Sequence, residues 1–446
     1  MRSLPSSRLC LSGKARYQNS QDVFRKNGLV VMLPEFIGYV TQREGKKFLE
    51  LEGKVNESVI SGSGLGGGEG ISLYIHIPFC KTLCPFCCFN RYPLKEKKAR
   101  EYFKNLKKEL DYYIERGFIF SNFYFGGGTP TVMMDELTGF IGYLREKFEV
   151  RQISLETNPN DVNRENVKLL KEAGINRLSI GVQSFNNDTL KTMGRVFCTG
   201  EEIKDVLPLA QGQFDTLNVD FVFNFPGQSI ESFEADVDIF KTMGMDQATF
   251  YPLMASPHKK SAMERRFNRV DLSRERKFYE VILRDLFTSG YKTSTAWCFS
   301  KGDRMIDEYI IEYDDYIGIG AGSVSIVKGN FYVNSFALDT YEQLINTNRL
   351  PIVGWRTLSE RENLRYYLLT KLFGLEIDAK RFSSRFQADI NSKLRRELTF
   401  LRIFGLVQGE EKLRVTHKGM YPVSVMAKEF FTSLNTLRER YIEMQI

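Results

Sequence analysis

The sequence has no long apolar run and very little histidine or tryptophan. No stretch approaches the roughly 18 apolar residues that a membrane span requires, so no transmembrane helix is expected. The N-terminal stretch MRSLPSSRLCLSGKARYQ contains arginines but lacks the apolar core of a secretory signal, so nothing points to export. With three histidines in 446 residues, few histidine side chains are available as ligands of a metal-containing group.

Size and charge narrow the class of protein. A chain of 446 residues can form a barrel-sized domain and a smaller second domain. The net charge of +7 comes from 62 basic and 55 acidic residues spread along the chain. This modest excess does not have the character of a nucleic-acid-binding surface, and we expect no nucleic-acid partner.

The cysteines are unevenly distributed. The stretch IHIPFCKTLCPFCCF contains four of the seven, whereas Cys10, Cys198 and Cys298 lie far apart. An odd number with one tight cluster differs from a secreted disulfide framework. We therefore expect a reducing, cytoplasmic environment and a metal site.

The pattern of apolar runs predicts an α/β fold. Residues 1–60 form an N-terminal segment of unknown role, and SGSGLGGGEG at 61–70 is a linker by composition. From there, short apolar runs alternate with helical segments, which implies parallel crossovers and hence a barrel or a doubly wound sheet. The predicted strands are 72–77, 122–127, 153–157, 177–183, 217–223 and 248–253, and the helices between them are 99–116, 134–147, 164–173, 201–211 and 229–243.

A smaller second domain is expected at the C-terminus. A glycine-rich turn within residues 316–334 closes the core domain, which we place at 71–335. After Pro351 we expect helix, with Ser359 and Glu362 as a capping box. Further helices and a short hairpin predict a small winged-helix-like domain at 351–446.

The cysteine spacing indicates an iron–sulfur cluster. Cys80, Cys84 and Cys87 follow a predicted strand as Cys-x3-Cys-x2-Cys, and Pro85 excludes regular helix between them. Three thiolates on a compact loop can hold three irons of a [4Fe–4S] cube and leave the fourth iron open. A zinc site is the alternative, although it usually takes four ligands from two separated pairs.

This stretch resembles the signature of the radical S-adenosylmethionine (SAM) superfamily. Its IHIPFC opening resembles the branch of oxygen-independent coproporphyrinogen III oxidase, its related haem chaperone and two-SAM methyltransferases. The resemblance runs from about residue 73 to 430. It implies a partial (β/α)6 TIM-like barrel and two molecules of SAM, one of which is cleaved reductively at the cluster to a 5′-deoxyadenosyl radical.

The resemblance also implies which residues bind SAM. Glycines permit close approach of backbone to the methionine end of SAM, and an arginine can pair with its carboxylate. The matching positions are Tyr74, Phe86, Gly126, Gly127, Gly128, Thr129, Glu156, Gln183, Arg195, Asp220 and Val324.

The sequence departs from the oxidase in two respects. The oxidase continues its motif as Cys-x-Cys, whereas Cys88 and Phe89 follow Cys87 here, and the N-terminal segment of its substrate pocket is missing. The chaperone's His-Asn-x-x-Tyr-Trp stretch has no counterpart either. The sequence therefore favours methyl transfer to an sp² carbon, with porphyrinogen oxidation in haem biosynthesis and haem binding without catalysis as alternatives.

Candidate catalytic residues are a thiol or carboxylate near the cleft. We consider Cys88, Cys298, Asp307 and Glu308, with Asp314 and Asp315 nearby. Aromatic residues in the same region suit a flat conjugated substrate such as a quinone or tetrapyrrole. A flavodoxin or ferredoxin would supply electrons, and peripheral contact with a membrane is left open.

Overall fold

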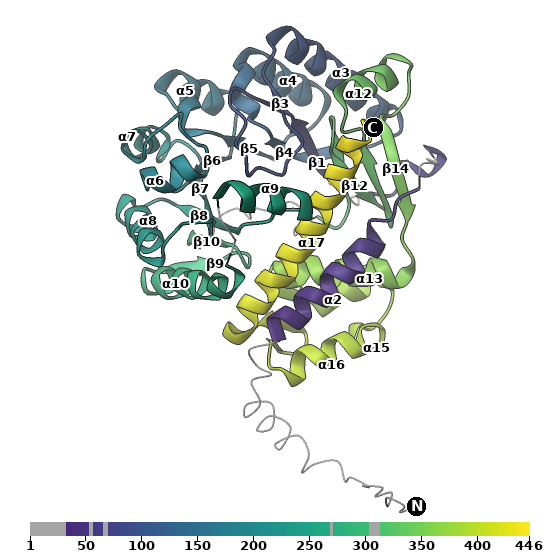
Figure 1. Cartoon of the computed structure of the whole chain (residues 1–446). Coiled ribbons are helices and arrows are strands. Elements are labelled where there is room, and N and C mark those ends of the chain that lie inside the picture. The colour runs from purple at the N-terminus through teal and green to yellow at the C-terminus, as the bar shows by residue number, and fades with distance from the viewer. Residues whose placement is uncertain (1–32, 53–56, 66–69, 268–270, 303–312) are drawn as a thin grey trace, which may run out of the picture.

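A single large sheet organises the protein. The computed structural model describes residues 33–52, 57–65, 70–267, 271–302 and 313–446 (Figure 1). The sheet has 12 strands in the order β14-β13-β12-β11-β1-β4-β5-β6-β7-β8-β10-β9. Its centre is a run of six parallel strands, each paired with the next one along the chain, as the sequence predicted.

Helices alternate with these parallel strands and cover the outside of the curved sheet (Figure 1). The strands are β1 (Ile71–Ile77), β4 (Phe120–Gly127), β5 (Gln152–Thr157), β6 (Arg177–Gln183), β7 (Thr216–Phe223) and β8 (Gln247–Pro252). The helices are α3 (Glu96–Glu115), α4 (Met134–Lys147), α5 (Arg164–Glu172), α6 (Asn187–Thr192), α7 (Gly200–Ala210), α8 (Ile230–Met243), α9 (Pro257–Phe267) and α10 (Glu275–Thr288).

Local sequence fixes where several of these helices begin. Asn163, Asn186 and Ser229 each accept a hydrogen bond from the backbone three residues on, and Thr199 forms a complete capping box with Glu202. Such caps satisfy amide groups that would otherwise lack a partner. Each helix therefore starts at a defined residue. Since the strands are parallel, their polar carboxyl ends lie together at one edge of the barrel.

Antiparallel strands extend both edges of the sheet. On one edge β11 (Tyr316–Ile319) pairs parallel to β1 and is followed by antiparallel β12 (Val324–Val327), β13 (Asn330–Asn334) and β14 (Ile352–Thr357). On the other edge stand β10 (Cys298–Lys301) and β9 (Tyr291–Thr293). The helix expected after Pro351 begins at Glu360, because residues 352–357 first form β14 and pair with β13 in the main sheet.

The C-terminal part is helical with a small three-stranded sheet. It contains α13 (Glu360–Phe373), α14 (Ala379–Phe386), α15 (Ile390–Lys393), α16 (Arg395–Ile403) and the strands β15 (Glu376–Asp378), β16 (Val407–Gln408) and β17 (Lys412–Val415). The capping box of Ser359 and Glu362 is present. The last helix, α17 (His417–Glu443), crosses the open side of the barrel (Figure 1).

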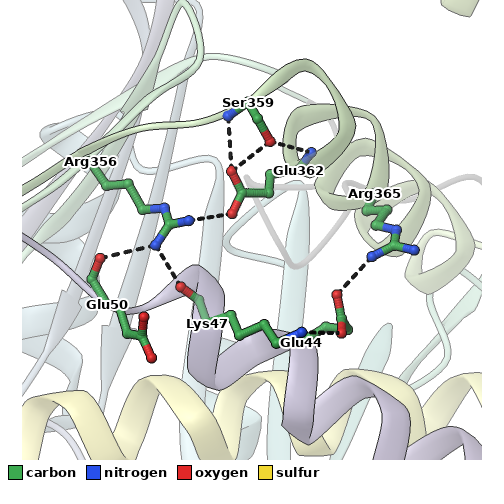
Figure 2. A network of polar contacts seen from close by, with 7 residues as sticks. All are labelled: Glu44, Lys47, Glu50, Arg356, Ser359, Glu362 and Arg365. Carbon is green, nitrogen blue, oxygen red and sulfur yellow. Dashed lines mark hydrogen bonds and ion pairs between the residues drawn. The ribbon is translucent and has the colours of Figure 1, made fainter.

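The N-terminal segment contributes a helix that the sequence pattern did not reveal. Helix α2 (Leu33–Phe48) lies beside α17 (Figure 1). Arg356 donates to the carbonyl oxygens of Lys47, at 2.7 Å, and Glu50, at 3.1 Å, and also pairs with Glu362 (Figure 2). Arg365 on α13 pairs with Glu44 at 2.7 Å. These contacts fasten α2 to β14 and α13.

In the described residues no helix has both the length and the apolar character needed to cross a membrane.

Candidate functional site

A cavity of about 310 Å³ lies at the carboxyl ends of the parallel strands. Its walls include the strand ends of the barrel, the cysteine loop that follows β1, and residues 430–438 of α17, and residues of β11 to β13, Trp297 and Tyr366 complete them. Parallel α/β folds place ligands at this end of their strands. The C-terminal helix therefore closes a site whose base is the barrel.

The three motif cysteines line this cavity together. Cys80 lies in the two-residue strand β2 (Phe79–Cys80), which pairs with β3 (Tyr92–Pro93), so the loop between them is held as a closed turn. Thr129 donates to the Cys80 Sγ at 3.6 Å, and the Arg195 Nη1 lies 3.6 Å from the Cys84 Sγ. The sulfur atoms thus face a common space with hydrogen-bond donors around them.

The donors around the cysteines suit an anionic cluster. Arg91 donates to the carbonyl oxygens of Cys84 and Cys87, while its Nε and Nη1 are buried without a partner, as is the Nε of Arg195. Buried guanidinium nitrogens left unpaired are costly unless an anion balances them. In a [4Fe–4S] cube each cysteine would ligate a different iron, so the three thiols need not converge on one ion.

The glycine run at the end of β4, residues 126–128, is required by close packing. Gly127 has φ +111°, and a Cβ there would lie 2.5 Å from the His76 ring. A Cβ at Gly126 would lie 2.9 Å from Glu156 Oε1, and one at Gly128 would lie 2.6 Å from the Phe79 carbonyl oxygen. A larger residue would clash at each of these positions. Because glycine has no side chain, the backbone here can approach a ligand closely.

His76 stands behind the glycine run. It is buried, and burial lowers its pKa to about 4. Its Nε2 lies 2.8 Å from the Asn90 carbonyl oxygen, and its Nδ1 lies 3.0 Å from the Tyr74 hydroxyl. A neutral ring that donates from Nε2 and accepts at Nδ1 satisfies both contacts. Tyr74, which lines the cavity, is thereby held in place.

The two carboxylates of the cavity are each held by neighbours. Glu156 accepts from the Tyr124 hydroxyl at 2.9 Å and from the Gly127 amide at 3.2 Å. Asp220 accepts from the Ser179 hydroxyl at 2.8 Å and from the Asn218 amide nitrogen at 2.7 Å. Both acids are therefore oriented before any ligand binds.

Gln183 and Arg195 both line the cavity. Gln183 has φ +71°, unusual for a residue other than glycine, at an irregularity in the pairing of β6 with β7. Arg195 donates to the Gly181 carbonyl oxygen at 2.6 Å and to Asn158 Oδ1 at 3.2 Å. Left-handed backbone of this kind costs about 1 kcal/mol or more and often marks a functional site.

The structure brings most of the predicted site residues to the cavity. Of the predicted SAM-binding residues, all except Gly126 line it, and Gly126 lies directly behind Glu156. These residues come from β1, β4, β5, β6, β7 and β12, from the cysteine loop, and from the segments after β4 and α6. Their assignment to SAM remains a prediction that this convergence supports.

The candidate catalytic residues lie in different parts of the structure or outside its described residues. Cys88 lines the cavity, but Cys298 is fully buried in β10 and is not among its lining residues. Asp307 and Glu308 lie outside the described residues. Asp314 pairs with Lys371 and Arg381, and Asp315 with Arg385, so both acids tie the C-terminal helices to the core. Of the candidate catalytic residues that the structure describes, only Cys88 therefore lies at the cavity.

Comparison with known proteins agrees with this geometry. The profile of the Radical SAM superfamily matches residues 74–240. The chain contains a radical SAM domain. The cofactors of this domain are a [4Fe–4S] cluster and SAM, and the cavity residues fit both.

Relatives match the chain well beyond that domain. The heme chaperone HemW of Bacillus subtilis is 27% identical, over 78% of this chain and 96% of its own length. Oxygen-independent coproporphyrinogen III oxidase of Helicobacter pylori is 26% identical, over 81% of this chain and 85% of its own. The solved structure of coproporphyrinogen III oxidase (HemN) from Escherichia coli aligns with a TM-score of 0.73 and 23% identity, over 86% of this chain and 95% of that one. The predicted radical SAM barrel is confirmed.

Cys88 of the radical SAM domain is held as a neutral thiol. Its Sγ donates to the Met254 carbonyl oxygen at 3.0 Å, and burial raises its pKa to about 11. A thiol in this state is a poor base at neutral pH, because it already carries the proton that a base would have to accept. Its position beside Cys87 still leaves it within the cavity.

Several cavity residues gave no signal in the sequence. Arg91 and Tyr124 lie beside motifs, but Tyr251, Asn435 and Arg438 are far from any motif. The last two are on α17, whose sequence reads as an ordinary amphipathic helix. Only the tertiary structure brings them to the radical SAM site.

A buried carboxylate anchors the glycine turn after β11. Glu109 on α3 accepts hydrogen bonds from the Gly320 amide at 2.8 Å, the Tyr341 hydroxyl at 2.6 Å and the Asn334 amide nitrogen at 2.6 Å. Burial raises its pKa from 4.5 to about 7 despite these donors. The turn it holds includes Gly322, which lines the cavity.

This raised pKa predicts a pH-dependent stability. Since the folded state binds the Glu109 proton more tightly than the unfolded state, the resulting stabilisation is complete below the unfolded pKa and is lost as pH rises through about 7. The free energy of unfolding of the wild type, relative to Glu109→Gln, should therefore fall between about pH 5 and pH 8. Denaturant titrations at both pH values measure it. Glu115→Gln, at an exposed site on the same helix, should keep the wild-type slope, and equal slopes for all three proteins would disprove the assignment.

Proposed function

We propose that the protein is a radical SAM enzyme that oxidises a porphyrinogen, with coproporphyrinogen III as the first substrate to test. The observation that carries the proposal is the single cavity that joins the three motif cysteines to a wall of aromatic side chains. Phe89, Tyr251, Trp297, Phe430 and Phe431 all line it. Such a wall suits a flat conjugated molecule, and the relatives that match most of the chain act on, or are named for, tetrapyrroles.

The chemistry must remove a carboxyl group and leave a double bond. Conversion of a propionate side chain to a vinyl group releases CO₂, one hydrogen atom and one electron. SAM held at the cysteine loop would supply the 5′-deoxyadenosyl group that accepts the hydrogen atom, on one-electron reduction by a donor such as flavodoxin or ferredoxin and with release of methionine, and a one-electron acceptor would take the electron from the substrate. The chain's own part is to hold the side chain beside the SAM-binding residues and to exclude water.

The residues of the cavity fit these tasks. The glycine run and Glu156 would hold the amino end of SAM, since backbone and carboxylate oxygens accept from an ammonium group. Arg195 would pair with a carboxylate through its unpartnered Nε. We assign Gln183, Arg195 and Asp220 jointly to the cleaved SAM and a second SAM beside it.

Methyl transfer, which the sequence favoured, has no support from these relatives. The relatives cited above, which match more than three quarters of the chain, are named as a chaperone and as oxidases. Of the candidates that the structure describes within residues 298–315, Cys298, Asp314 and Asp315 do not line the cavity. Porphyrinogen oxidation therefore replaces methyl transfer as the leading hypothesis.

Haem binding without catalysis is the second candidate. It is favoured by the match to the heme chaperone over nearly that protein's whole length. Against it, no histidine is among the described residues that line the cavity, and His76 uses both ring nitrogens within the protein. Haem would have to be held by another ligand, of which Cys88 is the one at hand.

Product analysis distinguishes these functions. We expect the reconstituted, reduced protein to convert coproporphyrinogen III under anaerobic conditions to a vinyl product, with 5′-deoxyadenosine and methionine formed from SAM. Mass spectrometry of both the tetrapyrrole and the SAM products measures this. S-adenosylhomocysteine formed in step with substrate would overturn the proposal in favour of methyl transfer. Tight haem binding without any conversion of the porphyrinogen would favour the chaperone.

A further inference from the structure

A cationic side chain from helix α17 enters the cavity beside its aromatic residues. Arg438 on α17 lines the cavity and is half-buried, and among the described residues no carboxylate forms an ion pair with it. Its Nη1 donates a hydrogen bond to Asn435 Oδ1 at 2.8 Å, and its guanidinium carbon lies 5.0 Å from the centre of the Phe89 ring. The rest of the guanidinium edge remains available to a ligand.

The position of this guanidinium is fixed from both sides. Asn435, which accepts from Arg438, donates in turn to the Met254 carbonyl oxygen at 3.1 Å. The same carbonyl oxygen accepts from the Cys88 Sγ. Arg438 is therefore tied through Asn435 and Met254 to the loop that contains the cluster cysteines, and not to the outer surface of α17.

The other charged groups of the cavity lie against the cysteine loop or the strand ends, among the predicted SAM-binding residues. Glu156 and Asp220 accept from their neighbours, and Arg195 donates to Gly181, Asn158 and the Cys84 sulfur. Arg91 donates to two carbonyl oxygens of the cysteine loop. Arg438 differs from these because it stands over the ring of Phe89, one of the aromatic residues against which a flat substrate would lie.

We propose that Arg438, held by Asn435, binds a carboxylate side chain of the substrate and so selects carboxylated tetrapyrroles over neutral ones. This proposal rests on the function proposed above and adds the residue that recognises the acid group. A guanidinium can form two parallel hydrogen bonds to one carboxylate, and the cation–π contact with Phe89 keeps its plane in place. Helix α17 thus contributes to substrate specificity in addition to closing the barrel.

Binding measurements test this assignment directly. The probes are coproporphyrin III, which has four carboxylates, and its tetraamide, which has none, added to the anaerobically reconstituted protein with SAM. Fluorescence titration gives the two dissociation constants. We expect Arg438→Gln to weaken coproporphyrin III binding about tenfold and to leave tetraamide binding unchanged. Arg438→Lys should retain part of the affinity, because it keeps the charge but not the fork.

Controls separate the possible failures. Arg440→Gln, at an exposed position of the same helix, should bind both probes as the wild type does. Iron content per chain reports whether the cluster is retained in each variant. Equal loss of both probes in Arg438→Gln, or no loss of either, would overturn the role of Arg438. If the wild type preferred the tetraamide, the proposal would also fall. A wild type that binds neither probe would instead disprove the proposed tetrapyrrole function.

Discussion

Replacement of Cys84 by alanine should abolish the cleavage of SAM. Cys84 is one of the three motif cysteines, all of which line the cavity, and its sulfur lies 3.6 Å from the Arg195 Nη1. With two thiolates remaining, one further iron of the cube loses its protein ligand. Iron content should fall, and the yield of 5′-deoxyadenosine after reconstitution and reduction should drop to background.

A second cysteine variant provides the matched control. Cys198 is buried and does not line the cavity. Cys198→Ala removes the same sulfur atom from the chain and should retain both the cluster and SAM cleavage. Full cleavage of SAM by Cys84→Ala would disprove the cluster assignment, and a loss confined to melting temperature would show that Cys84 is structural.

Substitution of Gly127 by alanine should slow SAM cleavage about a hundredfold, since displacement of a site by about 1 Å can have an effect of this size. The added Cβ would lie 2.5 Å from the His76 ring, at a φ of +111°. The ring is held by hydrogen bonds at both nitrogens, so the glycine loop must move. The initial rate of 5′-deoxyadenosine formation, measured at saturating SAM, reports this effect.

A glycine elsewhere separates local strain from a general effect of alanine. Gly142 lies on the exposed face of α4, and a Cβ there meets nothing within 4 Å. Gly142→Ala should stabilise the protein by about 1 kcal/mol, since alanine favours helix, and should leave SAM cleavage unchanged. A wild-type rate for Gly127→Ala would show that the glycine run does not shape the SAM site.

Much of the fold and of the cluster site could be predicted from local sequence. The period of the apolar runs predicted the six parallel strands, and the spacing of Cys80, Cys84 and Cys87 predicted their common cavity. Helix α2 was missed because its apolar residues contact α13 and α17 along only part of its surface. Strand β14 was missed because its formation depends on pairing with β13, which a local pattern does not report.

The sequence by itself determined the chemistry that the site can hold, since three cysteines within eight residues and a glycine run after a strand are local features. The tertiary structure decided which distant groups share that site. It placed Arg438 and Asn435 on α17 against the cysteine loop, and it buried Cys298 away from the cavity. The physical reason is that ligation depends on short-range spacing, whereas substrate contacts arise from the packing of helices that are far apart in the chain.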